Sequence, residues 1–366
     1  MATLSNTALE VDSPLSLPSH YYSDPEIYQM ELDRIFYRNW LFVGFRSELE
    51  NPGDYITKNI GSEGIFVVRS QDGTLNGFYN VCRLRAHRLL EGNGHIQDIV
   101  CPYHAWRYNL DGILCFARNS ANVDGFDSKE FRLQTIQVED FSGFIFINLD
   151  PDASPLVEQV PTLEEEFKSY EPNIDNLQLV YRQHITIESN WKNVVDNYNE
   201  NYHTPKVHPI LASILDDSYT VTLKGKYLRH ESNASSGEDD GFQVNVKDYP
   251  KHVTWWLWPN LCPMSIPGGG FRVLNILPTG PNQTHETYDF YLPYTEPNAQ
   301  QWAQIKYAVD VVNQEDITVV ESIQKGLKSR SFNRSYIMID QHQGWWSEHA
   351  IAHFRDMILQ SLRDVY

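Results

Sequence analysis

The sequence predicts an α+β protein of two domains, a small all-β domain placed ahead of an α+β domain with an antiparallel sheet. Short β-type runs separated by turn residues fill residues 41–151, and mixed strand-like and helical segments fill residues 152–366. A chain of 366 residues is long enough for two domains. Strands followed by a run of helices favour an α+β second domain.

A helix is predicted ahead of the β domain, in the segment PEIYQMELDRIFYRNW at 25–40. Its apolar residues recur at helical spacing, and Asp24 and Pro25 stand where an N-cap and a first-turn proline belong. We expect residues 1–40 to pack on the second domain, which makes residues 41–151 an insertion. Within the insertion the runs LFVGF, DYITKNI, GIFVVRS and GFYNVC are strand-like, and SQDGT carries the Asp-Gly pair of a hairpin turn.

The second domain alternates helices with strands before it ends in helices. LEEEFKSY and WKNVVDNYNENYH are predicted helices, and LQLVYRQHITIES, VTWWLWP, RVLNILPTG and THETYDFYLPY are predicted strands. From about Asn298 the pattern is helical to the end of the chain.

Charge and hydropathy exclude several classes of function. With 29 basic and 48 acidic residues the net charge is -19, which disfavours nucleic acid as a partner. No apolar run approaches the roughly 20 residues that span a bilayer, so no membrane association is expected. The segment MATLSNTALEVDSPLSLPSH has no basic region and no apolar core, and we therefore expect a cytoplasmic protein.

Two cysteine loops in the β domain have the residue types of a metal site. Cys101 and His104 form a Cys-x2-His pair, and Cys82 precedes it in the loop Cys82-Arg83-Leu84. Thiolates with imidazole suit zinc or an iron–sulfur cluster. A Rieske cluster has two cysteines on one iron and two histidines on the other, usually from Cys-x-His and Cys-x2-His loops. The expected histidine of the first loop is therefore replaced by Leu84.

A second candidate metal site lies in NWKNVVDNYNENYHTPKVHP at 190–209. Asp196, Glu200 and His203 fall on one stripe of a helix, and His208 lies about 140° further round. Both histidines can reach one metal only if the helix breaks between them, and Pro205 is predicted to supply that break. Two histidines and a carboxylate form the facial triad of non-haem Fe(II) oxygenases. The segment NQEDITVVES offers three candidates for the carboxylate: Glu315, Asp316 and Glu321.

Taken together, these motifs resemble the oxygenase components of Rieske non-haem iron oxygenases over nearly the whole chain. The likeness is greatest to the carnitine monooxygenase group, with glycine betaine and choline monooxygenases as relatives. It rests on YNVC, CPYHAW, NWKNVVDNYNENYH and EDITVVESIQKGLKSR. The resemblance implies a Rieske domain at 41–151 and a helix-grip-like catalytic domain at 152–366.

The resemblance also assigns roles to individual residues. It implies that the mononuclear iron is bound by His203, His208 and Asp316, and that Glu200 bridges the cluster of one subunit to the iron of its neighbour. Cys82, Cys101 and His104 match cluster ligands, and Leu84 does not. His87 and His95 lie nearby, but we do not expect either to replace the missing ligand, since His87 also occurs in family members with an intact cluster site.

The family implies partners as well as cofactors. These are O2, a separate NAD(P)H-dependent flavin and iron–sulfur reductase, a trimeric assembly and a cationic substrate of the carnitine or betaine type. The implied chemistry is hydroxylation beside a cationic nitrogen, followed by N–C cleavage.

Aromatic faces hold quaternary ammonium groups, at about 0.5–2 kcal/mol for each contact. The candidates are Tyr202 and the tryptophans of VTWWLW, of which Trp256 and Trp258 alternate to one face of the strand and Trp255 to the other.

Leu84 leaves three hypotheses for the working protein. The first is an oxygenase impaired at one cluster ligand. The second is a cluster-deficient subunit of a mixed oligomer, in which a neighbour's cluster serves this chain's iron. The third is a non-redox binding or regulatory protein that retains the fold.

Overall fold

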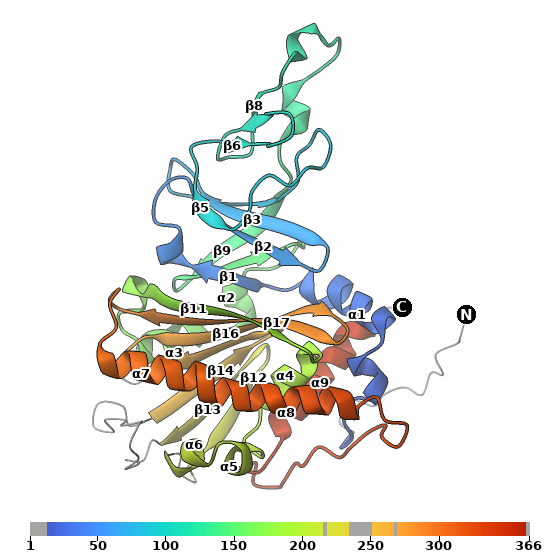
Figure 1. Ribbon diagram of the computed structural model, residues 1–366, viewed down its shortest axis with the longest axis vertical. Coiled ribbons are helices and arrows are strands. Elements are labelled where there is room, and N and C mark those ends of the chain that lie inside the picture. The colour runs from blue at the N-terminus through green and yellow to red at the C-terminus, as the bar shows by residue number, and fades with distance from the viewer. Residues whose placement is uncertain (1–12, 215–217, 234–250, 267–268, 364–366) are drawn as a thin grey trace.

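A computed structural model describes residues 13–214, 218–233, 251–266 and 269–363. It has an upper lobe of strands, loops and short 3-10 helices, and a lower lobe in which helices cover a sheet (Figure 1). The α+β class with antiparallel sheets is confirmed. Among the described residues no helix is both long and apolar enough to cross a membrane.

The upper lobe contains a seven-stranded sheet and a three-stranded sheet. The larger has the order β1-β10-β9-β4-β3-β2-β5, with all pairs antiparallel. Its strands are β1 (Leu41–Phe45), β2 (Asp54–Ile60), β3 (Glu63–Arg69), β4 (Leu75–Tyr79), β5 (Asn93–His95), β9 (Thr135–Phe141) and β10 (Phe144–Asn148). The smaller contains β6 (Ile99–Val100), β7 (Arg107–Tyr108) and β8 (Leu114–Phe116). The predicted Asp-Gly turn joins β3 to β4, closed by a hydrogen bond from the Ser70 amide to the Thr74 carbonyl.

The lower lobe is built on one seven-stranded antiparallel sheet. Its order is β11-β17-β16-β15-β14-β13-β12. The strands are β11 (Gln178–Ile187), β12 (Thr220–Lys224), β13 (Tyr227–Asn233), β14 (Lys251–Leu257), β15 (Leu261–Ser265), β16 (Phe271–Gly280) and β17 (Gln283–Leu292). The strands predicted in this part of the sequence are confirmed.

The two faces of the lower sheet have different partners. One face packs against β10 and α3 (Leu163–Tyr170), where the rings of Phe167 and Trp255 lie 5.1 Å apart and those of Phe144 and Phe271 lie 5.7 Å apart. The other face is covered by helices α4 (Trp191–Tyr198), α8 (Asn313–Gly326) and α9 (His349–Leu362). The candidate functional residues of this lobe lie between the sheet and these helices.

The remaining helical segments are short or lie at the surface. They are η1 (Ser19–Tyr22), η3 (Arg46–Glu48), η4 (Ser120–Asn122), η5 (Ser128–Phe131), α2 (Leu156–Gln159), η6 (Ile174–Asn176), α5 (Thr204–Val207), α6 (Pro209–Ile214), α7 (Ala299–Tyr307) and η7 (Ala308–Val312). The last two run directly into α8 and form one long helical stretch across the sheet (Figure 1).

The predicted N-terminal helix is present and packs on the lower lobe. It consists of α1 (Pro25–Glu31) and a π-helical turn, η2 (Leu32–Phe36), and the Asp24 side chain caps it by accepting from the Glu26 amide at 2.8 Å. Phe36 packs edge-on against Trp191 of α4, with ring centroids 5.0 Å apart. The first twelve residues lie outside the described part of the chain.

A buried carboxylate joins this helix to α4. Glu31 accepts hydrogen bonds from the Trp191 indole at 2.8 Å and from the Lys192 ammonium, and both Glu31 and Lys192 are completely buried. Burial lowers the pKa of Lys192, and the Glu31 carboxylate opposes that shift. The pair holds the start of α4 against the N-terminal helix.

A second ion-pair network joins the two lobes. Arg182 of β11 binds Glu48 of the upper lobe at 2.7 Å and Asp289 of β17 at 2.6 Å. The Arg182 side chain is 14% exposed and that of Asp289 2%, so solvent screens these pairs weakly.

We predict that Glu31→Gln destabilises the protein by about 3–5 kcal/mol, because the Lys192 charge loses its partner in the interior. Urea or thermal unfolding of the full chain measures the change. Asp33→Asn, an exposed carboxylate on the same segment, is the matched control and should shift stability by less than about 0.5 kcal/mol. Equal effects of the two variants would contradict the assigned role of Glu31.

Candidate metal centre and cavity

The residues of the second motif are positioned by a helix that ends earlier than predicted. The Asn190 side chain caps α4 by accepting from the Lys192 amide at 3.0 Å, but α4 stops at Tyr198. Glu200 and His203 therefore lie in the turn that follows, and they do not continue a helical stripe from Asp196. The run of asparagines after Tyr198 favours this exit, because asparagine side chains compete with helical hydrogen bonding.

Pro205 also has a different role from the one predicted. It stands in the first turn of α5, with His203 as the N-cap residue and His208 as the C-cap residue. A proline is tolerated in the first turn because that position needs no amide hydrogen bond. The helix break is thus real, but it precedes His203, and Pro205 begins the next helix.

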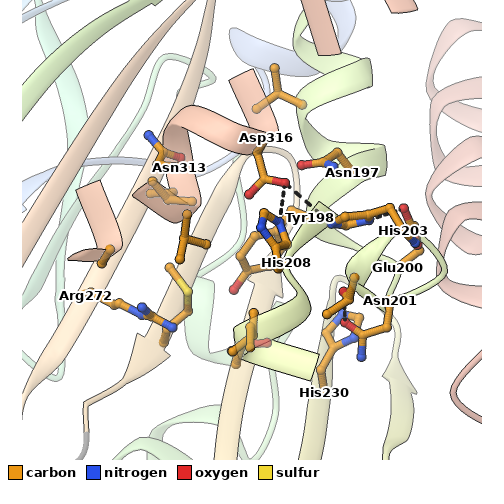
Figure 2. Close-up of a pocket in the computed structure, with 18 of the residues that line it drawn as sticks. Asn197, Tyr198, Glu200, Asn201, His203, His208, His230, Arg272, Asn313 and Asp316 are labelled. Carbon is orange, nitrogen blue, oxygen red and sulfur yellow. Dashed lines mark hydrogen bonds and ion pairs between the residues drawn. The ribbon is translucent and has the colours of Figure 1, made fainter. Parts of the chain in front are cut away.

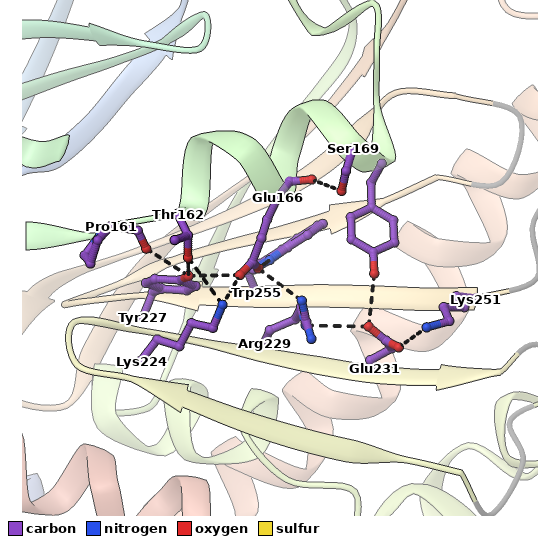
Figure 3. A network of polar contacts seen from close by, with 11 residues as sticks. Pro161, Thr162, Glu166, Ser169, Lys224, Tyr227, Arg229, Glu231, Lys251 and Trp255 are labelled. Atoms are coloured by element: carbon purple, nitrogen blue, oxygen red, sulfur yellow. Dashed lines mark hydrogen bonds and ion pairs between the residues drawn. The ribbon is translucent and has the colours of Figure 1, made fainter.

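Two histidines and an aspartate converge at this point. His208 Nε2 lies 2.8 Å from Asp316 Oδ1, and His203 Nε2 lies 3.4 Å from the same oxygen. Asp316 comes from the first turn of α8, so it meets the two histidines at the ends of α5 from a separate helix (Figure 2). One donor atom from each residue lies within 4.8 Å of the others, the only such group of three found among the described residues. This donor set fits Fe(II), which takes two histidines and one carboxylate with positions left open.

Each histidine also binds a glutamate through its other nitrogen. His203 Nδ1 contacts Glu200, whose second oxygen accepts from the His203 amide at 3.0 Å. His208 Nδ1 lies 2.7 Å from Glu315. Carboxylates in this position fix the tautomer and orientation of metal-binding histidines.

The three candidates for the carboxylate ligand have different positions in the structure. Asp316 faces both Nε2 atoms, and Glu315 faces the opposite nitrogen of His208. Glu321 accepts from the Glu188 amide at 3.0 Å, away from the histidines. The orienting role of Glu315 could not be read from spacing, because adjacent residues on a helix point in different directions.

The charges around the histidines shift their pKa values. Burial disfavours imidazolium, but hydrogen bonds with Asp316 and Glu200 outweigh it and raise the pKa of His203 to about 9. The pKa of Asp316 is lowered: burial raises it, and the two histidines more than reverse that effect. Burial also raises the pKa of Asp196 to about 7; its carboxylate lies 3.2 Å from the Tyr22 hydroxyl.

The trio borders a cavity whose floor is the helix-covered face of the lower sheet. Alternate residues of neighbouring strands face it, as the pleat requires. The strand residues are Ile187 of β11, His230, Glu231 and Ser232 of β13, His252 and Thr254 of β14, Met264 of β15, Arg272, Leu274 and Ile276 of β16, and Glu286 and Tyr288 of β17. Helices α4 and α8 supply Val194, Asn197, Tyr198, Asn313, Ile317 and Val320. Burial raises the pKa of Glu286 to about 7, against a hydrogen bond from Asn313.

The predicted substrate-binding aromatics do not lie on this cavity. Trp256 and Trp258 do share one face of the strand, with ring centroids 6.0 Å apart, but they pack under α9 against Phe354. Neither tryptophan is among the residues that line the cavity. Tyr202 is 47% exposed and packs against Trp346. The aromatic residues that line the cavity are Tyr198, Tyr219 and Tyr288.

The two cysteine loops of the upper lobe have the same backbone form. The Cys82 amide donates to the His87 carbonyl, and the Cys101 amide donates to the Trp106 carbonyl, each at 2.8 Å. Ala86 and Ala105 occupy equivalent left-handed positions, at φ 54° and 58°.

The side chains in these loops form an incomplete ligand set for a cluster. The Cys82 and Cys101 side chains are buried and in contact. Leu84 is 38% exposed, and it lines a surface cavity together with His104. Leu84 offers no donor atom, so the residues present fit three of the four positions of a Rieske cluster.

The two nearby histidines, His87 and His95, have other contacts in this structure. His95 belongs to β5 and its Nδ1 lies 2.9 Å from Asp54. His87 Nδ1 contacts the Arg88 carbonyl at 2.5 Å. Neither lines the cavity that Leu84 shares with His104.

Comparison with known proteins identifies a family for each of the two lobes. Residues 39–127 match the Rieske [2Fe-2S] domain, and residues 174–364 match the ring hydroxylating alpha subunit (catalytic domain). Among curated relatives, the carnitine monooxygenase oxygenase subunit of Escherichia coli K12 is 37% identical over 95% of this chain and 94% of its own. The chloroplastic choline monooxygenase of Amaranthus tricolor is 32% identical over 94% and 77%.

Solved structures give the same result. A quaternary ammonium Rieske monooxygenase, described for carnitine oxidation and inter-subunit electron transfer, has a TM-score of 0.91 and 34% identity over 95% of this chain and 96% of its own. The enzyme CntA in complex with L-carnitine has a TM-score of 0.88 and 33% identity over the same shares. The chain therefore belongs to the Rieske non-haem iron oxygenases, as an alpha (oxygenase) subunit.

Proposed function

We propose that this chain is the oxygenase subunit of a monooxygenase that hydroxylates a quaternary ammonium compound beside its nitrogen. The observation that carries the proposal is the convergence of His203, His208 and Asp316 on the wall of a buried cavity. The relatives act on carnitine and choline by name, and one structure holds carnitine as its substrate.

We assign the metal ligands to the three converging residues. Fe(II), when bound there, supplies the open coordination positions at which O2 is activated. Glu200 and Glu315 hold the Nδ1 side of the two histidines and keep both Nε2 atoms directed at one point. Apolar residues of α4, α8 and β16 line part of the cavity wall.

Tyrosine rings replace the predicted tryptophans in binding the ammonium group. Tyr198, Tyr219 and Tyr288 line the cavity, and we assign their rings to cation binding. The Tyr198 hydroxyl donates to the Trp255 carbonyl at 3.0 Å, which fixes the ring against the sheet. A rigid ring loses little entropy on binding.

The overall reaction consumes O2, two electrons and two protons. One oxygen atom enters the C–H bond beside the nitrogen and the other leaves as water. The N–C bond then breaks, which releases a tertiary amine and leaves a carbonyl on the other fragment. The electrons require a separate NAD(P)H-dependent reductase, and we propose a trimer in which Glu200 lies at the inter-subunit path.

The leucine at position 84 leaves two alternatives to this function, a mixed oligomer and a non-redox binding protein. Because the cluster ligands are incomplete, a homotrimer of this chain should transfer electrons poorly. A mixed oligomer would use an intact neighbour's cluster, and co-purification with an intact homologue would support it. A non-redox binding protein would show no substrate-dependent O2 uptake in either assembly.

We propose domain limits of 1–40, 41–151 and 152–366. The contacts of the N-terminal helix with α4 support grouping it with the catalytic domain. A cytoplasmic location stays a prediction from the sequence.

Iron binding is predicted to weaken as the pH falls. A histidine must be neutral to bind a metal, and the carboxylates around His203 raise its pKa to about 9 in the metal-free protein. Below that pH, binding must displace at least one proton, and the pKa of His208 is raised as well, so the affinity for Fe(II) should fall at least about tenfold for each unit between pH 8 and pH 6. Anaerobic titration at several pH values measures the slope, and a constant affinity would contradict it.

Substitution of the carboxylate ligand tests the assignment directly. Asp316→Asn should lower the affinity for Fe(II) by at least about tenfold. Glu321→Gln on the same helix keeps its acceptor for the Glu188 amide and should leave the affinity unchanged. Similar losses in both variants would sink the assignment.

Leu84→His is predicted to restore the cluster site. Acid-labile sulfide should rise toward two per chain with the visible and EPR signature of a Rieske centre, since the fourth ligand is supplied. Substrate-dependent O2 uptake with a reductase should increase at least about tenfold. Leu84→Gln, of similar size but not a Rieske ligand, is the control. No gain of sulfide over this control would refute the first hypothesis.

A further inference from the structure

Arg272 is a cationic side chain on the cavity floor that the proposed chemistry leaves without a role. It lies on β16 and shares its face with Leu274 and Ile276, all three lining the cavity. Arg272 opposes Met264 on β15 and Phe290 on β17 in the strand register, so its immediate cross-strand neighbours carry no charge.

Arg272 has no carboxylate partner among the residues that the structure describes. No ion pair within 4.0 Å joins it to an aspartate or glutamate there, and its buried Nε has no hydrogen-bond acceptor. Its polar contact is the Tyr288 hydroxyl. Glu286, on the same face of the sheet, is instead hydrogen-bonded by Asn313 at 2.7 Å.

Arg182 of the same sheet is a useful comparison, because its guanidinium is paired with carboxylates. Arg182 on β11 binds the carboxylates of Glu48 and Asp289 and the hydroxyl of Tyr291. Both arginines are largely removed from solvent, but only Arg182 is paired within the described chain. An unpaired charge facing a sheltered cavity is costly, and a ligand anion would remove that cost.

The position of Arg272 suits one end of an elongated ligand. Figure 2 shows Arg272 on the side of the cavity away from Glu200 and His203, with His208 and Asp316 between. A planar guanidinium pairs with a carboxylate through two parallel hydrogen bonds. A ligand carboxylate on Arg272 would let the ligand's opposite end extend toward the tyrosines and the metal ligands.

We propose that Arg272 binds the carboxylate of a zwitterionic substrate and so selects trimethylammonium carboxylic acids over amino alcohols such as choline. This inference rests on the proposed function and narrows its substrate class. Arg272 is then a specificity-determining residue, remote from the carbon that is hydroxylated.

Equilibrium binding to the full chain loaded with Fe(II) under anaerobic conditions tests the proposal without needing a working cluster. The probes are γ-butyrobetaine and butyltrimethylammonium, which carry the same cation with and without a carboxylate. The intact protein should bind γ-butyrobetaine at least about tenfold more tightly. Arg272→Gln should weaken γ-butyrobetaine binding by about 10- to 100-fold and change butyltrimethylammonium binding by less than about twofold.

Two further variants separate recognition from a merely structural role. Arg272→Lys should recover part of the preference, because it keeps the charge but loses the two-point geometry. Arg330→Gln removes one positive charge from the exposed surface and should change neither affinity. The thermal midpoint of ligand-free Arg272→Gln should not fall, because the arginine has no partner anion to lose.

The outcomes distinguish this inference from the proposed function. Equal binding of the two probes by the intact protein, or equal loss of both in Arg272→Gln, would overturn the carboxylate assignment while the quaternary ammonium function stands. Failure of both probes to bind the intact protein would overturn the proposed function, and the role of Arg272 with it.

Discussion

The position of the candidate metal centre depends on the buried contact of the Glu31 carboxylate with Trp191 and Lys192. The carboxylate neutralises Lys192 and accepts from Trp191, the first two residues of α4. The end of α4 leads directly into the turn that holds Glu200 and His203, so the position of this helix sets the position of both. A buried pair of this kind adds little net stability but strongly disfavours arrangements that separate its members. The N-terminal helix thus packs on the lower lobe, although the β lobe follows it in the chain.

The centre combines residues distant in sequence because the sheet and helices face each other across one cavity. The strand residues reach it by alternation, and Asp316 reaches it from the first turn of α8. Carboxylates lie on both sides of each imidazole, which orders the histidines before any metal binds. The same cavity brings together aromatic rings and a cationic side chain, the two kinds of group that recognise a zwitterion.

The strands and the metal-binding motif could be predicted from local sequence signals. The predictions that were wrong concerned features that depend on tertiary packing. Alternation predicted that Trp256 and Trp258 share a face, but not that α9 covers that part of it. The spacing of His203 and His208 required a break, but the asparagines after Tyr198 placed it earlier than the proline did. Asp316 was one of three acids until the fold brought α8 to the histidines. Arg272 lay in a predicted strand, and only the sheet register shows that it faces the cavity.

The shared backbone form of the two cysteine loops bears on how substitutions at position 84 can occur. Their shape is held by backbone hydrogen bonds and left-handed alanines, which do not involve the side chain at position 84. Leucine codons of the CTT or CTC type become histidine codons by a single base substitution. The loop keeps its backbone form with leucine at this position, so Leu84→His should need no compensating change elsewhere. Under the proposed assignment of the cluster ligands, a single base substitution at position 84 would decide whether the cluster site is complete.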